Sequence, residues 1–186
     1  MAKHFIDIEN FNKETLLEIL SIANSIKKSP TNYSEKLKNK SLGMIFEKQS
    51  TRTRVSFDIG MKKLGGEVIE MDTDSIGFGE RESNIDIVKV LSQYLDCLVL
   101  RNDDHEIIKQ LADINSIPII NGLSNYSHPC QILSDIFTIE EKKGPIINLL
   151  ISWSGDINNV LISLAQASKI LDFRLNVACP EKILNQ

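Results

Sequence analysis

The sequence predicts an α/β protein in which a doubly wound parallel sheet domain is followed by the first β-α-β unit of a second, incomplete α/β domain. Short apolar runs alternate along the chain with longer segments of helical periodicity, which is the order found in parallel βαβ units. Gly144 and Pro145 interrupt this alternation. We therefore expect a first domain over residues 1–143 and an incomplete second domain over residues 144–186.

The elements of the first domain follow from local patterns. Leucines at helical spacing predict a helix over residues 13–28, which Ser29 and Pro30 end. The apolar run Ser41–Phe46 predicts the first strand, and a helix follows from the polar turn at residues 50–54 to Gly65. The further expected strands are 67–71, 97–100 and 117–121, and the further expected helices are 83–94, 106–114 and 129–143.

The last part of the chain predicts one more β-α-β unit. Its expected elements are a strand at 147–153, a helix at 158–171 and a strand at 173–178. Two parallel strands and one helix leave an apolar face uncovered, so we expect this second domain to be incomplete. Because catalysis needs groups on both sides of a reacting pair, we also expect the 186-residue chain to be inactive alone.

Composition excludes several classes of partner. The chain has 186 residues, of which 42% are hydrophobic and 25% charged, and its net charge is −4, so we expect no nucleic-acid or membrane partner. Three cysteines without C-x-x-C spacing disfavour a disulfide framework or a zinc site. No signal peptide, transit peptide or membrane-spanning run is readable, so we expect a cytoplasmic protein.

The segment Ser50-Thr51-Arg52-Thr53-Arg54 predicts an anion site. It lies between an expected strand and an expected helix, where free backbone N–H groups and the positive helix end face a ligand. Hydroxyl groups and the planar guanidinium of Arg52 suit phosphate oxygens. The alternative is a plain N-cap, but arginines in a first turn oppose the helix dipole unless an anion lies between them.

Two further polar residues follow expected strands. Arg101 comes directly after residues 97–100, and His128 lies in the loop after residues 117–121. Because ligands of doubly wound sheets bind outside the carboxyl ends of the strands, both residues fall on the same rim as residues 50–54. Taken singly, such an arginine is commonly a solvated residue and such a histidine is commonly structural.

Three motifs, in order, resemble those of the aspartate and ornithine transcarbamoylases. Phe46–Phe57 has the form F-E-K-x-S-T-R-T-R-x-S-F, which resembles the carbamoyl-phosphate signature of that family. Residues 120–131, I-N-G-L-S-N-Y-S-H-P-C-Q, resemble the second signature in its ornithine form, since the aspartate enzymes carry Thr where Cys130 stands. Residues 153–160 resemble the W-x-G-D-G-N-N-V segment of the ornithine enzymes.

The resemblance implies an ornithine carbamoyltransferase that acts in arginine metabolism, with carbamoyl phosphate and ornithine as substrates, no metal and no cofactor. It also implies a homotrimer for a full-length protein. Arg101 and His128 are the implied catalytic residues. The implied carbamoyl-phosphate residues are Ser50, Thr51, Arg52, Thr53, Arg101, His128 and Gln131, and the implied ornithine residue is Asn159, with Asn158 beside it.

Some residues depart from the family pattern. Ile157 replaces the second glycine of G-D-G-N-N-V, and in the loop at residues 77–82 Gly77 and Glu80 stand where a glutamine and an arginine are usual. Two alternatives therefore stay open, which are a truncated, non-catalytic carbamoyl-phosphate-binding remnant and an aspartate-type or other amine transcarbamoylase. A nucleotide-binding Rossmann domain is disfavoured, because no G-x-G-x-x-G follows an expected strand.

Overall fold

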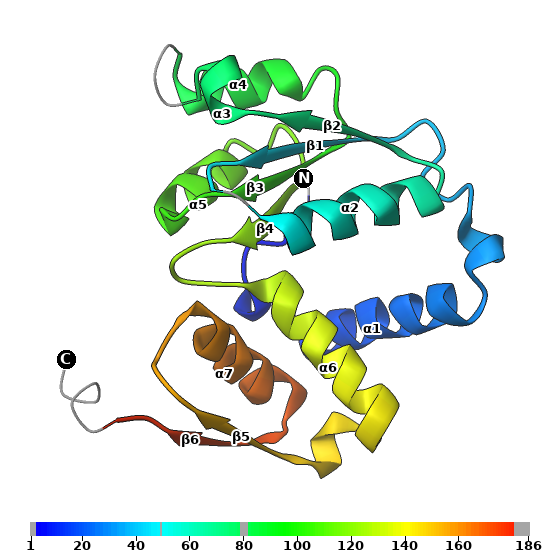
Figure 1. Cartoon of the computed structure of the whole chain (residues 1–186), viewed down its shortest axis with the longest axis vertical. Helices are drawn as coiled ribbons and strands as arrows, with labels where there is room; N and C mark the ends of the chain where they lie inside the picture. The colour runs from blue at the N-terminus through cyan, green and yellow to red at the C-terminus, as the bar shows by residue number, and fades with distance from the viewer. Residues whose placement is uncertain (1–2, 49, 79–81, 181–186) are drawn as a thin grey trace.

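Four parallel strands, hydrogen-bonded in the order β2-β1-β3-β4, form a sheet in the upper half of Figure 1. They span Ser41–Phe46 (β1), Glu67–Met71 (β2), Cys97–Arg101 (β3) and Ile119–Leu123 (β4). The chain winds outward from β1 to β2 and then crosses back to β3 and β4 on the other side. This arrangement confirms the doubly wound α/β prediction, in a computed structural model that describes residues 3–48, 50–78 and 82–180.

Helices cover both faces of this sheet. Along β1, Met44 packs toward α2 (Thr51–Lys63), whereas its neighbour Ile45 packs toward α4 (Asn84–Leu91) and α5 (His105–Asp113). Because successive side chains of a strand point to opposite faces, an unbroken apolar run suits a strand that is buried on both. A short helix, α3 (Thr73–Ile76), lies between β2 and α4.

A second core fills the lower half of the molecule (Figure 1). It is built from η1 (Ile8–Asn10), α1 (Lys13–Lys28), α6 (Pro129–Lys143), η3 (Ile146–Asn148), α7 (Asn159–Leu171) and the two parallel strands β5 (Leu150–Ser154) and β6 (Arg174–Ala178). We call this cluster the lower core. Leu16 of α1 and Ile136 of α6 pack in it together with Leu164 and Leu171 of α7. The lower core thus joins residues from both sides of the expected boundary, and the division at residue 143 stays a prediction.

Most element boundaries lie close to the predicted ones. The bounds of α1, β1 and β2 coincide with the predicted bounds. β4 lies two residues later than expected, because its pairing with β3 begins at Ile119 and Pro118 has no N–H for a ladder. β5 begins at Leu150 rather than at residue 147, since the preceding apolar residues form η3, through which Ile146 enters the lower core.

One further connecting segment, η2 (Pro30–Tyr33), follows α1 as the predicted stop at Pro30 requires. No helix within the described ranges is both long and apolar enough to cross a bilayer.

We expect the lower core to contribute strongly to stability. Ile136 is fully buried in it, so Ile136→Ala should lower the free energy of unfolding by about 2–5 kcal/mol. Thr138, exposed on the same helix, is the matched control, and Thr138→Ala should change stability by about 0.5 kcal/mol or less. Urea denaturation followed by circular dichroism measures both, and equal losses in the two variants would contradict this role for Ile136.

Candidate active site

The carboxyl ends of β1, β3 and β4 open into a cavity of about 710 Å³. It lies where the winding of the sheet reverses between β1 and β3, which is the position at which doubly wound sheets bind ligands. We call it the rim cavity. The residues that line it are Ser50, Thr51, Arg52, Thr53, Arg101, Leu123, His128, Gln131, Asp135 and Val160. The structure thus brings together all seven residues expected to bind carbamoyl phosphate, from three segments that are distant in sequence.

The amino-terminal end of α2 forms one wall of the rim cavity. Ser50 is the N-cap residue, with extended backbone angles (φ −151°, ψ 108°), yet none of the described backbone N–H groups donates to its side chain. The first turn carries no acidic residue. Backbone N–H groups and the positive end of the helix dipole are therefore available to an anion at Thr51–Thr53. This observation favours the anion site over a plain cap.

The hydroxyl of Ser50 accepts a hydrogen bond from Arg101 instead. Arg101 is the last residue of β3, and its Nη1 lies 3.0 Å from Ser50 Oγ. This bond spans the crevice between β1 and β3, so it fixes the guanidinium beside the amino-terminal end of α2. Arg101 Nε is buried and has no hydrogen-bond partner among the described residues, so it retains a donor. The arrangement places a positive charge and a free N–H at the edge of the rim cavity.

His128 lies on the opposite wall, in the last position before α6. Its backbone N–H donates to Ser163 Oγ at 2.9 Å, and its ring nitrogen Nδ1 is buried with no partner in the described part of the chain. Burial, and to a smaller extent the charge of Arg101, lower the pKa of His128 to about 4. The ring is therefore neutral at pH 7 and can donate one N–H to an oxygen in the cavity.

Gln131 lies in the first turn of α6. Its Nε2 donates to Asp135 Oδ1 at 2.8 Å, which fixes the amide and leaves Oε1 to accept from a ligand N–H. Asp135 was not predicted as a site residue. A signal for it existed, because Asp135 follows Gln131 by four residues and the two must share one face of a helix.

The loop of residues 124–128, which we call the His128 loop, is held by buried hydrogen bonds on both sides. On one side, Ser124 Oγ lies 2.8 Å from His105 Nδ1, and His105 Nε2 lies 3.1 Å from Asp7 Oδ2. On the other, Ser127 Oγ lies 3.1 Å from Ser163 Oγ of α7. Asp7 and His105 were not predicted, and only their burial as polar groups in the folded chain identifies them.

The residues expected to bind ornithine have local partners in the structure. Asn159 Nδ2 donates to the carbonyl of Ser124 at 2.7 Å, and its neighbour Val160 lines the rim cavity. Asn158 is the N-cap of α7, and its Oδ1 accepts from two backbone N–H groups of the first turn. The ornithine role of Asn159 stays a prediction.

Arg54 does not share the rim cavity. The expectation that it would face the same anion as Arg52 was wrong, because its guanidinium forms an ion pair with Glu70 of β2. Both side chains line a neighbouring cavity of about 470 Å³. Of the loop that departs from the family pattern, Gly79, Glu80 and Arg81 lie outside the described residues.

The cysteines near these sites are protonated thiols at pH 7. Burial raises the pKa of Cys97 to about 11 and that of Cys130 to about 12. All three cysteines are free. Among the residues that the structure describes, no group of three or more His, Cys, Asp or Glu side chains is arranged to hold a metal ion.

Comparisons with known proteins agree with this geometry. The family model described as "Aspartate/ornithine carbamoyltransferase, carbamoyl-P binding domain" matches residues 3–141. The ornithine carbamoyltransferase of Rhodopseudomonas palustris strain CGA009 is 42% identical over 186 residues, with 98% of this chain and 60% of the relative covered. The Rhizobium meliloti enzyme is 44% identical over 183 residues, with 97% and 60% covered.

Solved structures give the same result. The ornithine carbamoyltransferase of Pyrococcus furiosus superposes with a TM-score of 0.94 at 38% identity, covering 98% of this chain and 59% of that one. The Burkholderia thailandensis enzyme superposes with a TM-score of 0.91 at 38% identity, covering 97% and 63%. The chain thus spans about 60% of the length of the curated relatives it matches.

Proposed function

This chain belongs to the aspartate/ornithine carbamoyltransferase family, and we propose on that premise that its rim cavity binds carbamoyl phosphate. We propose further that the whole protein transfers the carbamoyl group to the δ-amine of ornithine, giving citrulline and phosphate. One observation supports the proposal most strongly. The groups at the start of α2 that can donate hydrogen bonds to an anion line the same cavity as Arg101 and His128.

The phosphate end of the substrate is assigned to α2. Ser50, Thr51 and Thr53 supply hydroxyl groups, the first turn supplies backbone N–H groups, and Arg52 supplies a planar fork for two phosphate oxygens. Charge-assisted hydrogen bonds of this kind are each worth about 1.5–3 kcal/mol. The net charge of −4 makes such local donors necessary for an anionic substrate.

The carbonyl end is assigned to Arg101 and His128, with Gln131 accepting from the carbamoyl amide. The nitrogen lone pair of the neutral δ-amine attacks the carbonyl carbon, and negative charge develops on the carbonyl oxygen. The C–O bond to phosphate then breaks, phosphate leaves with the bonding electrons, and the attacking nitrogen loses a proton. Arg101 and the neutral ring of His128, which both line the rim cavity, are the N–H donors assigned to that oxygen, and one such donor is worth about 2.7–4 kcal/mol.

Ornithine is the proposed acceptor because the similar proteins carry that substrate in their names. The curated relatives and solved structures compared above are ornithine carbamoyltransferases. Cys130 within the S-H-P-C-Q segment also follows the ornithine form of the second motif. The competing proposals are an aspartate-type enzyme and a non-catalytic protein that only binds carbamoyl phosphate.

Product analysis separates these proposals. With saturating carbamoyl phosphate, we expect the whole protein to form citrulline from ornithine and no carbamoyl-aspartate from aspartate. The 186-residue chain should bind carbamoyl phosphate without forming citrulline, because its described residues complete only the carbamoyl-phosphate side of the reacting pair. Citrulline formation by the 186-residue chain would contradict this division of labour. Absence of both products from the whole protein would favour the non-catalytic alternative.

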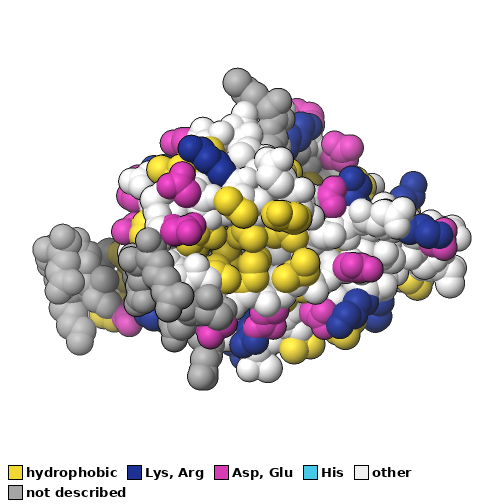
Figure 2. All heavy atoms as spheres, turned by 90° about the horizontal axis from the view of Figure 1, so that it is seen from above, with side chains coloured by type: hydrophobic (Ala, Val, Ile, Leu, Met, Phe, Trp, Pro, Cys, Tyr) yellow, Lys and Arg dark blue, Asp and Glu magenta, His cyan; other side chains and the backbone are white. Residues whose placement is uncertain are grey.

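A homotrimer and a cytoplasmic location complete the proposal. Ile69 on β2, Ile85 and Val90 on α4, and Tyr94 in the turn after α4 are exposed. Figure 2 shows hydrophobic side chains gathered on the side of the molecule where these elements lie. An apolar surface of this kind supports association with further copies of the chain. The three free cysteines suit the reducing conditions of a cytoplasm, where the proposed reaction would serve arginine biosynthesis.

A further inference from the structure

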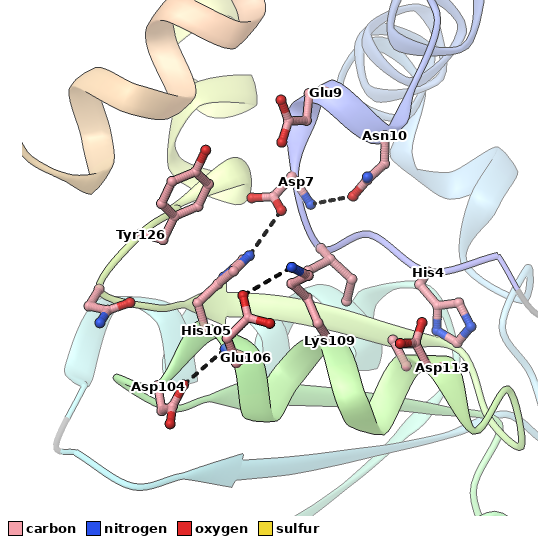
Figure 3. A pocket seen from close by; sticks show the side chains of 13 residues that line it. His4, Asp7, Glu9, Asn10, Asp104, His105, Glu106, Lys109, Asp113 and Tyr126 are labelled. Carbon is pink, nitrogen blue, oxygen red and sulfur yellow. Dashed lines mark hydrogen bonds and ion pairs between the residues drawn. The ribbon is translucent and has the colours of Figure 1, made fainter.

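We propose that a second cavity, of about 720 Å³, binds a small organic cation that carries an ammonium or guanidinium group. The cavity lies between the amino-terminal segment and α5, and Figure 3 shows its side chains. We call it the acidic cavity. It is separate from the rim cavity, although the His128 loop contributes residues to both.

The charge of the lining favours a cation. Five carboxylates line the cavity, against one lysine, Lys109, which is already paired with Glu106 at 2.9 Å. Glu9 and Asp113 are exposed, and neither accepts a hydrogen bond or forms an ion pair with any described residue. Carboxylates that face one cavity from separate elements raise the local concentration of cations.

Asp7 supplies a second, independent observation. It is only 4% exposed, and one of its oxygens, Oδ2, lies 3.1 Å from His105 Nε2. Its other oxygen, Oδ1, is buried and has no hydrogen-bond partner anywhere in the described ranges. In Figure 3 this carboxylate lies above the His105 ring, and its second oxygen points toward the Tyr126 side. Because an unsatisfied buried acceptor is costly, an N–H donor entering the cavity gains by pairing with Asp7.

The shape of the lining selects an organic cation over a metal ion. The carboxylates are spread around the cavity, and the described residues nowhere bring together three or more side chains in a metal-ligating group. Tyr126 is 41% exposed, and its ring centroid lies 5.0 Å from that of His105. An aromatic face beside carboxylates suits an alkylammonium or guanidinium group, which combines hydrogen bonds with a cation–π contact.

The acidic cavity and the rim cavity are lined by different residues. Asn125 and Tyr126 line the acidic cavity, whereas His128 and Gln131 line the rim cavity. Arg52, which holds the phosphate in our proposal, lines the rim cavity and is not part of the lining of the acidic cavity. Loss of carbamoyl-phosphate binding in an Arg52→Ala chain therefore leaves the second site intact.

The test is titration of the 186-residue chain with 1,4-diaminobutane at low ionic strength, followed by ¹H–¹⁵N NMR. We expect saturable shifts at the amides of Asn125 and Tyr126, with a Kd in roughly the millimolar range or below. The uncharged 1,4-butanediol should cause no such shifts. Absence of saturable shifts with the diamine, or equal shifts with the diol, would overturn the proposal.

Charge variants locate the site. Glu9→Gln combined with Asp113→Asn removes two exposed carboxylates that make no hydrogen bond or ion pair within the described ranges, and it should weaken binding about tenfold. Glu18→Gln, which removes an exposed carboxylate of α1 outside the cavity, should leave the affinity unchanged. Equal affinities in the wild type and the double variant would place the diamine elsewhere. Loss of diamine binding in Asp135→Asn, which removes a carboxylate that lines the rim cavity, would place the diamine in the rim cavity. Either result would overturn the acidic cavity as the site.

Discussion

Arg52→Ala is expected to abolish measurable binding of carbamoyl phosphate to the 186-residue chain while leaving its fold intact. Arg52 lines the rim cavity at the first turn of α2, where it is exposed and makes no ion pair with a described residue. Its loss removes two charge-assisted hydrogen bonds, together about 3–6 kcal/mol, so Kd should rise more than a hundredfold. Isothermal titration calorimetry measures the affinity, and circular dichroism checks the fold.

Arg54→Ala is the matched control for this experiment. Arg54 is on the same helix, two residues further along, but its guanidinium pairs with Glu70 in the neighbouring cavity. The two variants remove the same charge and the same number of atoms. They differ in which cavity the side chain lines and in the Glu70 ion pair, which Arg54→Ala breaks. We expect Arg54→Ala to bind carbamoyl phosphate with little change. Equal affinities in the wild type and Arg52→Ala, or equal losses in both variants, would refute the assigned phosphate site.

His128→Ala in the whole protein is expected to lower kcat by about a hundredfold or more, the usual cost of removing an oxyanion donor. The Michaelis constant for carbamoyl phosphate should change much less, because our proposal assigns the phosphate to residues at the start of α2, on the opposite wall of the cavity. Steady-state citrulline formation with each substrate varied in turn measures both constants. A rise in the Michaelis constant at unchanged kcat would mean that His128 binds the ground state instead.

The pH dependence of His128 follows from its burial. Its pKa of about 4 lies below the ordinary value of 6.5, so the ring stays neutral as pH falls through 6 and takes up a proton only near pH 4. NMR titration of the ring should show that midpoint. Between pH 6.5 and about pH 4 the histidine is protonated in the unfolded chain but still neutral in the folded chain. The free energy of unfolding therefore decreases as pH falls through that window. A ring that titrates near 6.5 would contradict a buried, neutral donor.

The sequence predicts the parts of this molecule that depend on local pattern. β1 and β2 are short apolar runs bounded by turn residues, and the structure has them at the expected positions. Arg101 and His128 could be placed on one rim because the carboxyl ends of parallel strands share an edge of a sheet. Contacts between segments that are distant in sequence could not be predicted from local pattern. Asp7 and His105 are 98 residues apart, and neither lies in a motif.

The direction in which the Arg54 side chain points likewise depends on a tertiary contact and could not be predicted from the sequence. Its sequence position suits an anion at the start of α2, but Glu70 of β2 lies within reach once the strand pairs with β1. The same holds for the lower core, in which α7 packs on α1 and α6 across the expected boundary. Such packing depends on which faces meet in the folded chain, and periodicity identifies only that a face is apolar.

The attachment of the His128 loop to α7 has a thermodynamic consequence. Ser163 accepts from the backbone of His128, and Asn159 donates to the backbone of Ser124, both at hydrogen-bond distance and with Ser163 fully buried. Moving α7 away from the loop would leave these groups unpaired, so the free energy of the loop depends on where α7 lies. A ligand that shifts α7 must then change the affinity of the rim cavity for carbamoyl phosphate. By linkage, carbamoyl phosphate in the rim cavity must change the affinity for the ligand that shifts α7 by the same factor.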